Sequence, residues 1–233
     1  YAYKIDTDLR PEGSKGVLIL SLRGYEDYFN DRAAIWERQA LTRARFVAGN
    51  PALGERFLNV VHAFTYRPKL EYSSLIEISR LRERMEKELA LESKKGRNVK
   101  LGFGGLADIE FAVQILQMMH GFRHPRLRSA NMLDLMPLLA TYGIISQEEV
   151  EQTKKQYLFL RNLECVLRIG GQHSTNYLPT DGKALSEVAR MLGYQEEDSD
   201  GLAKKLMDDY VATTQAVRVF YRKIIGMLLR TAL

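Results

Sequence analysis

The sequence is poor in cysteine and in long hydrophobic runs, and each shortage excludes a class of protein. One cysteine among 233 residues excludes an internal disulfide, so a reducing, cytoplasmic location is expected. No apolar run approaches the roughly 20 residues of a membrane span, and the first residues carry no signal-peptide core. The single Cys165 lies in an apolar helical stretch, where a small buried side chain is a better interpretation than a nucleophile.

The sequence also lacks the usual signatures of metal and nucleotide sites. Its four histidines show no zinc-ligand spacing, and Ser/His/Asp catalysis has no recognisable motif. Gly13-Ser14 is not followed by the Gly-Lys-Ser/Thr ending of a phosphate loop, and Gly102, Gly104 and Gly105 fit no dinucleotide fingerprint. These three glycines instead indicate a tight entry to the helix that follows them.

Basic residues outnumber acidic residues by 34 to 29, which gives a net charge of +5. This moderate excess permits contact with nucleotides or acidic partners without requiring it. A basic helical domain that grips nucleic acid would rest on this charge alone, so no nucleic-acid partner is expected. The first residue is not Met, and we expect the chain to begin inside a longer protein.

The only β signal stands at the beginning of the sequence. Residues 1–9 alternate, with Tyr3 and Ile5 between polar neighbours, and residues 17–20 (VLIL) form a second strand-like run after a Gly/Pro turn. This pattern predicts a β-hairpin. Because two strands alone are marginally stable, we expect further strands of the sheet upstream of Tyr1.

From about residue 30 onward the periodicity is helical. One helix is expected from about residue 31 to residue 47, where a Gly-Asn-Pro stretch would end it. Ser146 and Glu149 form a capping box for another helix. The remaining helices are expected at about 75–89, 108–120, 130–142 (with a late start or kink at Pro137), 146–169, just before Gly193, and from about 200 to 229. The sequence therefore predicts a mainly α protein, with an all-α bundle over residues 70–233.

The densest polar cluster is the segment 6–13 (DTDLRPEG). On a strand, Asp6 and Asp8 would point to the same face, a geometry that can hold Mg²⁺ through carboxylate oxygens. Arg10 beside them suits phosphoryl or nucleotidyl transfer, in which metal and guanidinium neutralise phosphate charge. A solvated strand end that enters a turn is the commoner explanation, and the residues alone leave both interpretations open.

A second candidate patch is basic. Arg38 and Arg45 are seven residues apart and would share one face of the expected helix, with Arg43 to its side. This spacing can form a patch for nucleotide phosphates, whereas a solvated helix face is the more common outcome.

Several short motifs follow one another along most of the chain. They are Tyr3-Lys4-Ile5-Asp6, Leu9-Arg10-Pro11-Glu12-Gly13, Gly16-Val17-Leu18, Trp36-Glu37-Arg38-Gln39-Ala40-Leu41, Arg43-Ala44-Arg45, Val99-Lys100, Gly104-Gly105, Asp108-Ile109-Glu110-Phe111, Tyr157–Glu164 and Leu178-Pro179. From about residue 3 to at least residue 195, they resemble the glutamine synthetase adenylyltransferases. The resemblance implies that residues 1–68 are the C-terminal part of a nucleotidyltransferase α/β domain, ending in the hairpin and a helix. Residues 69–233 would be its helical bundle domain.

The resemblance also implies an activity. Members of the family transfer AMP from ATP to a tyrosine of glutamine synthetase and remove it by phosphorolysis, under the control of PII signal proteins and glutamine. By resemblance, Asp6 is the third carboxylate of a Mg²⁺ site. Arg10 would brace the turn or bind the nucleotide phosphates, and Arg43 and Arg45 are further phosphate-binding candidates. The implied partners are glutamine synthetase, PII and ATP, and the wording of residues 40–49 is closer to the C-terminal, AMP-adding half.

Two departures from the family pattern limit these expectations. The family usually has arginine where this chain has Asp8, so Asp8 is not assumed to be catalytic. The family's ordered motif, a Gly-Ser followed about ten residues later by Asp-x-Asp, supplies two of three metal carboxylates and is absent from this sequence; one carboxylate cannot hold two metal ions. We therefore expect a fragment that is inactive alone. The alternative is a non-catalytic helical module that binds glutamine synthetase or PII.

Overall fold

The structure is a computed structural model in which the chain divides into two compact units. It describes residues 6–92, 96–170, 175–195 and 198–231. Unit 1 comprises residues 1–70 and 114–135, and unit 2 comprises residues 71–113 and 136–233. This division by contacts does not test the domain boundary expected after residue 68, which stays a prediction.

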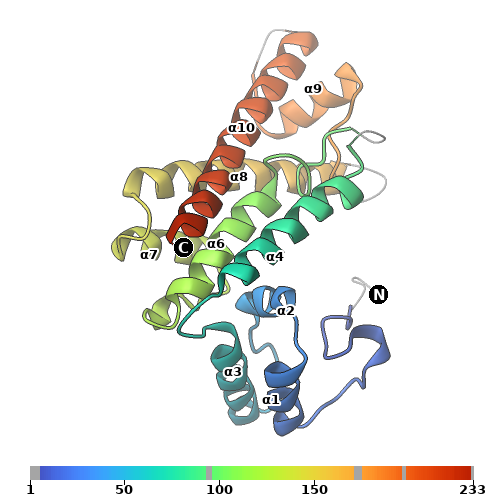
Figure 1. Cartoon of the computed structure of the whole chain (residues 1–233). Helices are drawn as coiled ribbons and strands as arrows, with labels where there is room; N and C mark the ends of the chain where they lie inside the picture. The colour runs from blue at the N-terminus through green and yellow to red at the C-terminus, as the bar shows by residue number, and fades with distance from the viewer. Residues whose placement is uncertain (1–5, 93–95, 171–174, 196–197, 232–233) are drawn as a thin grey trace. The chain divides into compact units, whose positions relative to one another are not determined.

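Unit 1 is built from short helices around an aromatic core. Its helices are α1 (Leu22–Asp31), α2 (Ile35–Ala40), α3 (Pro51–Thr65) and residues 114–120 of α6 (Leu106–His120). Helices α1 and α3 lie side by side (Figure 1), and Phe29 stacks on Phe64 with the ring centroids 4.6 Å apart. Tyr25 meets Phe57 edge to face at 4.8 Å. Aromatic pairs of this kind stabilise a small core beyond the area that they bury.

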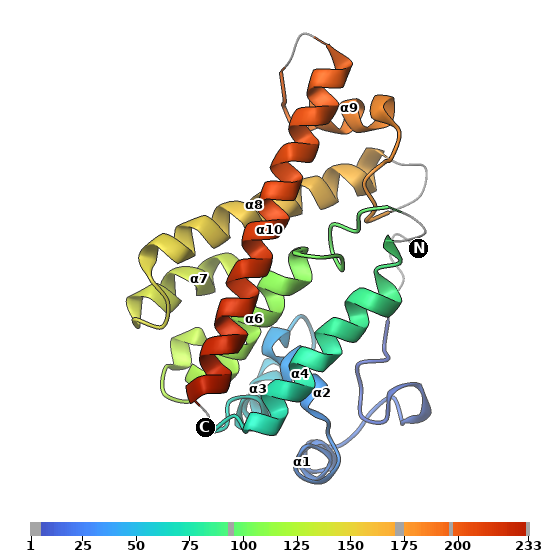
Figure 2. The same ribbon diagram turned by 45° about the horizontal axis from the view of Figure 1, so that its top comes forward.

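Unit 2 is an all-α bundle organised along the long helix α10 (Ser199–Thr231). Its other helices are α4 (Tyr72–Arg84) with a π-helical turn at Met85–Leu89, residues 106–113 of α6, most of α7 (Met132–Thr141), α8 (Gln147–Gly170) and α9 (Gly182–Met191). Helix α10 packs against α9, α8 and α4, as Figure 2 shows. The residues of α6 in this unit are almost all buried, so α6 is a central helix of the bundle.

The structure confirms the helices predicted from about residue 75 onward. Helices α4, α6, α7, α8, α9 and α10 lie within a few residues of the predicted ranges. The capping box is formed: Ser146 Oγ accepts the Glu149 N–H at 3.2 Å, and Glu149 Oε2 accepts the Ser146 N–H at 3.2 Å. Pro137 lies inside α7, and Gly193 follows α9 with a left-handed φ of 86°.

The single helix expected over residues 31–47 is wrong. Helix α2 ends at Ala40, a 3-10 turn covers Leu41–Arg43, and residues 44–48 have no regular secondary structure. The Thr42 hydroxyl donates to the Gln39 carbonyl at 2.7 Å, a local bond of the kind that competes with helix propagation.

Helices α1 and α3 were missed at the sequence level. For α3 the reason is visible: Pro51 is its first residue, where a missing N–H has no cost, and Asn50 Oδ1 accepts the Leu53 N–H at 3.1 Å. The Gly-Asn-Pro stretch therefore begins a helix as well as ending a segment.

The expected β-hairpin is not formed over the part of the chain that the structure describes. Residues 6–8 and 17–20 are in no strand, and residues 1–5, which would hold most of the first strand, lie outside the described residues. A strand needs a paired neighbour to satisfy its backbone, and the described residues offer none to this segment. Val17, Leu18 and Ile19 are accordingly exposed.

Helix α8 corrects the prediction for Cys165. The thiol residue is exposed, whereas its neighbours Leu163 and Glu164 are buried. The helix is amphipathic, and Cys165 falls on its solvent side.

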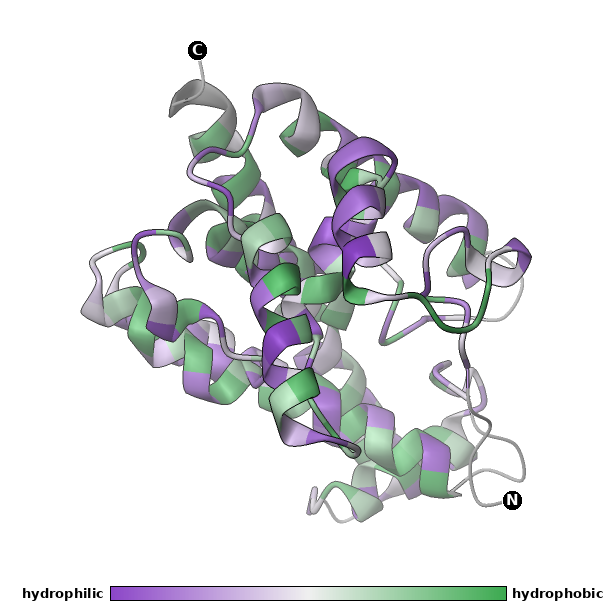
Figure 3. Cartoon of the chain, turned by 90° about the horizontal axis from the view of Figure 1, so that it is seen from below, coloured by the Kyte–Doolittle hydropathy of each residue, from purple (hydrophilic) through white to green (hydrophobic). Residues whose placement is uncertain are grey.

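In Figure 3 apolar and polar residues are mixed along the helices. Among the described residues, no helix is both long and apolar enough to cross a membrane.

Candidate functional site

The N-terminal turn carries Asp6, the predicted metal-binding carboxylate, and Arg10, a predicted phosphate-binding residue. Asp6 Oδ1 accepts the Asp8 N–H at 2.8 Å. Arg10 Nη1 donates to the Thr7 carbonyl at 2.7 Å, and Arg10 Nε donates to the Gly16 carbonyl at 3.3 Å. Asp6 and Asp8 do not share the face of a strand, because residues 6–8 are not in one. In this structure the guanidinium of Arg10 braces the turn while both carboxylates stay exposed.

The end of this turn is held against helix α1. Glu12 has a left-handed φ of 63°, and its N–H donates to the Tyr28 hydroxyl at 3.5 Å. Its carboxylate pairs with Arg32 at 2.6 Å. The turn that contains Asp6 and Arg10 is therefore anchored at one end by contacts from α1.

The remaining predicted phosphate-binding residues lie in another part of unit 1. Arg43 ends the 3-10 turn after α2, and Arg45 lies in the irregular segment that follows; both are exposed. The helix face that Arg38 and Arg45 were expected to share does not exist, because α2 ends at Ala40. Arg38 itself is buried.

Helix α2 presents three consecutive polar side chains to the interior of unit 1, namely Glu37, Arg38 and Gln39. The Tyr28 hydroxyl donates to Glu37 at 2.8 Å, and Gln39 Nε2 donates to Gln114 Oε1 at 2.9 Å. These bonds join α2 to α1 and to the unit 1 part of α6. Periodicity alone does not reveal them; the available signal was the Trp-Glu-Arg-Gln motif of the family resemblance.

Arg38 is a buried cation bonded to a neutral group. Its Nε donates to the Thr65 carbonyl at 2.8 Å, and its Nη2 has no hydrogen-bond partner among the described residues. Burial, together with the nearby positive charge of Arg67, lowers the pKa of Arg38 to about 10. The guanidinium remains charged at neutral pH.

In unit 2 the first turn of α6 places Asp108 between two arginines. Its Oδ1 lies 2.6 Å from Arg82 Nε and its Oδ2 lies 2.9 Å from Arg218 Nε. Glu86 pairs with the same two guanidiniums. Burial raises the pKa of Asp108 above that of an ordinary aspartate, while the two arginines act in the opposite direction and stabilise its charged form. Asp108 was expected near a helix start, but its partners are 26 and 110 residues away and no local pattern predicts them.

The glycines before α6 serve this arrangement. Gly104 has φ 64°, and a Cβ built on it would lie 1.8 Å from the Thr214 carbonyl oxygen of α10. Its N–H donates to Asp108 Oδ2 at 3.2 Å. A Cβ on Gly105 would lie 2.7 Å from the Val99 carbonyl oxygen. Gly104 therefore allows a close backbone approach to α10, and Gly105 allows the tight entry to α6 that the sequence predicts.

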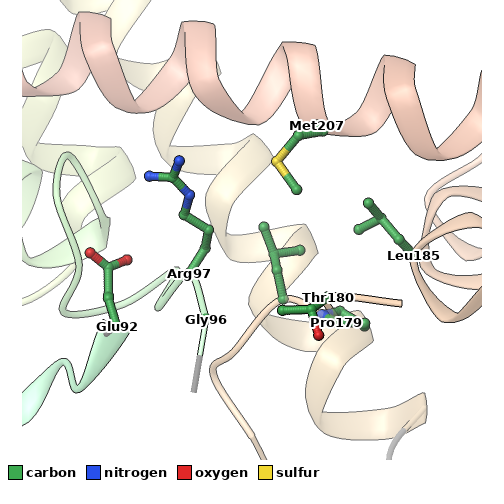
Figure 4. Close-up of a pocket in the computed structure, with 8 residues that line it drawn as sticks. Glu92, Gly96, Arg97, Pro179, Thr180, Leu185 and Met207 are labelled. Carbon is green, nitrogen blue, oxygen red and sulfur yellow. The ribbon is translucent and has the colours of Figure 1, made fainter. Parts of the chain in front are cut away.

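A cavity of about 570 Å³ lies elsewhere in unit 2 (Figure 4). It is lined by Glu92, Gly96, Arg97, Leu178, Pro179, Thr180, Leu185 and Met207. Two of its lining residues are joined through the backbone, since the Leu178 N–H donates to the Arg97 carbonyl at 2.9 Å. One carboxylate oxygen of Glu92 already accepts the Asn98 N–H at 2.8 Å. With one acid, one base and a largely apolar wall, the cavity suits a molecule of mixed polarity rather than a polyphosphate.

The described residues do not by themselves form a magnesium site. No group of three or more His, Cys, Asp or Glu side chains in the described ranges is placed to hold a metal ion. Asp6 is an exposed carboxylate that keeps one oxygen on a backbone N–H. It can offer one hard oxygen ligand, and the chemistry of Mg²⁺ requires several.

Two family models match consecutive parts of the chain. The model described as glutamate-ammonia ligase adenylyltransferase matches residues 1–60, and the model described as GlnD PII-uridylyltransferase matches residues 77–225. The first covers the turn with Asp6 and helix α2. The second covers most of unit 2, including the residues of the Asp108 cluster.

Curated relatives extend across both matches. Proteins named bifunctional glutamine synthetase adenylyltransferase/adenylyl-removing enzyme are 34% identical in Streptomyces avermitilis and Leifsonia xyli subsp. xyli, over 92% and 95% of this chain. The Hahella chejuensis protein of the same name is 32% identical over 83% of the chain. These alignments cover 21%, 22% and 20% of the respective relatives. The chain thus spans about a fifth of their length, and its resemblance to this group is confirmed.

Proposed function

Since the chain belongs to the family described as GlnD PII-uridylyltransferase over residues 77–225, we propose that it is part of a nucleotidyltransferase that regulates nitrogen assimilation. The full-length enzyme would transfer AMP from ATP to a tyrosine of glutamine synthetase and would remove it again. It would work in the cytoplasm, with a PII signal protein as its regulator. This chain would supply the end of one catalytic domain and its helical companion.

One observation carries the choice of adenylyl over uridylyl transfer. The relatives with the adenylyltransferase name align over 83–95% of the chain, from one family match into the other. The uridylyltransferase model covers only the helical part. A helical domain common to both kinds of enzyme explains the two descriptions, and the segment with Asp6 is the part that matches the adenylyltransferase model.

The proposed roles of the site residues follow the motif and the turn geometry. Asp6 would contribute one carboxylate to a Mg²⁺ site whose other ligands lie outside this chain. Arg10 is held at the same turn, where it would brace the backbone beside the metal or approach a phosphate. Arg43 and Arg45 are exposed cations, as a role on nucleotide phosphates requires. Bound Mg²⁺ would neutralise charge on the triphosphate; these four side chains would position and polarise groups around it.

A substitution pair tests the role of Asp6 in the full-length protein. Asp6→Asn should lower AMP incorporation into glutamine synthetase by at least about a hundredfold, because an amide cannot replace a metal-binding carboxylate. Asp27→Asn is the matched control, since it removes an exposed carboxylate of helix α1 outside the turn that holds Asp6 and Arg10. Undiminished incorporation by the Asp6 variant, or an equal loss in both variants, would remove Asp6 from the site.

A second candidate function is a binding module without catalysis of its own. It is favoured by two units that each have buried hydrophobic residues. Titration calorimetry of the 233-residue chain with glutamine synthetase, and separately with PII, tests the module. Binding to either protein without AMP transfer supports it, and binding to neither protein would contradict it.

A further inference from the structure

A second cavity in unit 2 has a lining unlike that of the first. It measures about 490 Å³ and is lined by residues of α4, the π-helical turn and the C-terminal part of α10; Figure 2 shows these helices. It is lined by Ser79, Arg82, Glu83, Glu86, Lys87, Arg218, Tyr221, Arg222, Ile225 and Gly226. Its volume lies in the range of small-molecule sites.

Cations outnumber acids around this cavity. Arg82, Lys87, Arg218 and Arg222 face two carboxylates, those of Glu83 and Glu86. Asp108 is fully buried, is not among the residues that line the cavity, and pairs with Arg82 and Arg218. Even with this third acid, four positive charges meet three negative charges, so the cavity keeps a positive excess that favours an anion.

The buried arginines are fixed before any ligand arrives. Arg82 uses its three nitrogens on Asp108, on Glu86 and on the Gly102 carbonyl, the last at 2.9 Å. Arg218 pairs through Nε with Asp108 and through Nη2 with Glu86, and its guanidinium lies 4.5 Å from the ring centre of Phe103. These contacts leave Nη1 of Arg218 outside the ion-pair cluster. Prior fixing of a guanidinium lowers the entropy lost when an anion binds to it.

Further donors complete the wall. Lys87 and Arg222 are exposed at the rim, from the π-helical turn and from α10 respectively. Tyr221 is buried; its hydroxyl lies beside Ser79 but forms no hydrogen bond of ordinary geometry to a described residue. A buried hydroxyl without such a bond costs free energy that an acceptor oxygen on a ligand would recover.

We propose that this cavity between α4 and α10 is a binding site for a small molecule with an oxyanion group, either a phosphate or a carboxylate. The anion would accept from Arg218, Arg222 and the Tyr221 hydroxyl, with Lys87 adding charge at the rim. Glu86 keeps Arg82 and Arg218 in place and limits the site to ligands of low charge. The inference is independent of the proposed function, since it uses no residue of the N-terminal turn.

Titration of the 233-residue chain with inorganic phosphate and, separately, with glutarate tests the proposal. Isothermal titration calorimetry at constant ionic strength in sodium chloride should show saturable binding of at least one of them. Arg222→Ala and Tyr221→Phe should each weaken that binding by about tenfold, the equivalent of one charge-assisted hydrogen bond. Both variants spare the buried ion cluster and should fold.

Lys204→Ala is the matched control, because Lys204 is an exposed cation on the same helix and does not line the cavity. It should bind the anion as the unmodified chain does. Binding of phosphate alone or of glutarate alone supports the proposal and identifies the anionic group. No saturable binding of either compound, or an equal loss in the Lys204 variant, would overturn it.

Discussion

Both units bury arginine, but they do so in opposite ways. In unit 1 Arg38 donates to the Thr65 carbonyl, and its surroundings add the positive charge of Arg67. In unit 2 Arg82 and Arg218 are joined to Asp108 and Glu86 through several ion pairs. Burial lowers the pKa of Arg38 to about 10.

This difference indicates which buried charge each unit depends on. An ion cluster is interdependent: removal of one member leaves the others buried without compensation. A buried arginine that is bonded only to a neutral carbonyl is desolvated without a compensating negative charge. Replacement of its side chain by an apolar one removes this unfavourable desolvation free energy. We therefore expect unit 2 to be sensitive to charge removal and unit 1 to be tolerant of it.

The largest expected effect comes from Asp108. Asp108→Ala leaves two arginines with only Glu86 between them and should lower the free energy of unfolding by about 3–5 kcal/mol. Urea denaturation of the chain followed by circular dichroism measures the loss. Asp208→Ala, an exposed acid on α10, is the control and should change stability by less than about 0.5 kcal/mol. Equal stability of the two variants would mean that the ion cluster does not stabilise unit 2.

Gly104→Ala should destabilise unit 2 by roughly 2–4 kcal/mol, through a left-handed backbone and a clash with α10. Gly182→Ala is the control, because a Cβ there meets no atom within 4 Å and the backbone φ is not positive. The same urea titration compares the two. A Gly104 variant as stable as the Gly182 variant would mean that the segment before α6 does not approach α10 closely.

The direct comparison of buried arginines uses one substitution in each unit. Arg38→Met should cost no more than about 1.5 kcal/mol, because the lost bond to the Thr65 carbonyl is partly offset by the relief of a buried charge. Arg82→Met should cost at least twice as much, since Asp108 and Glu86 then share one guanidinium. If both substitutions cost the same in urea denaturation, the proposed difference between the units is wrong.

The smallest expected effect is a pH dependence in unit 1. The pKa of His62 is lowered mainly by burial and also by the charge of Arg128. The pKa of His120 is likewise lowered mainly by burial, and also by His124 and Arg123. Both histidines prefer the neutral form when folded, so the unfolded state binds more protons and stability falls as pH drops below about 6.5. Trp36, the single tryptophan, lies in this unit and reports its unfolding by fluorescence. The urea concentration at the midpoint of unfolding should decrease as the pH is lowered from about 7.5 to about 5.5. His62→Gln should make this decrease smaller. A midpoint that does not change with pH would contradict the roles of His62 and His120.

Sequence reasoning succeeded where structure is encoded locally. The Ser146–Glu149 capping box, the glycine after α9 and the apolar stripes of α4 and α6 are read from neighbours a few residues apart. It failed in unit 1, where Pro51 was interpreted as a stop rather than as the first residue of α3, and where α2 proved too short to carry Arg45.

The candidate sites show the same limit. Asp6 and Arg10 come from a contiguous motif, so their proximity in one turn follows from the sequence. The Asp108 cluster joins residues of α4, its π-helical turn, α6 and α10, and in the sequence its charges resemble those of solvated helix positions. The exposed position of Cys165 was likewise mistaken, because an apolar stretch of sequence does not show which side of α8 faces the core.

We propose that the chain is part of an enzyme that adenylylates glutamine synthetase, although its helical part matches a uridylyltransferase model. The direct measurement offers the full-length protein radiolabelled ATP or UTP, with glutamine synthetase or a PII protein as acceptor. The account predicts label from ATP on glutamine synthetase, and no label from UTP on either acceptor. Label from UTP on PII, with none from ATP on glutamine synthetase, would contradict it.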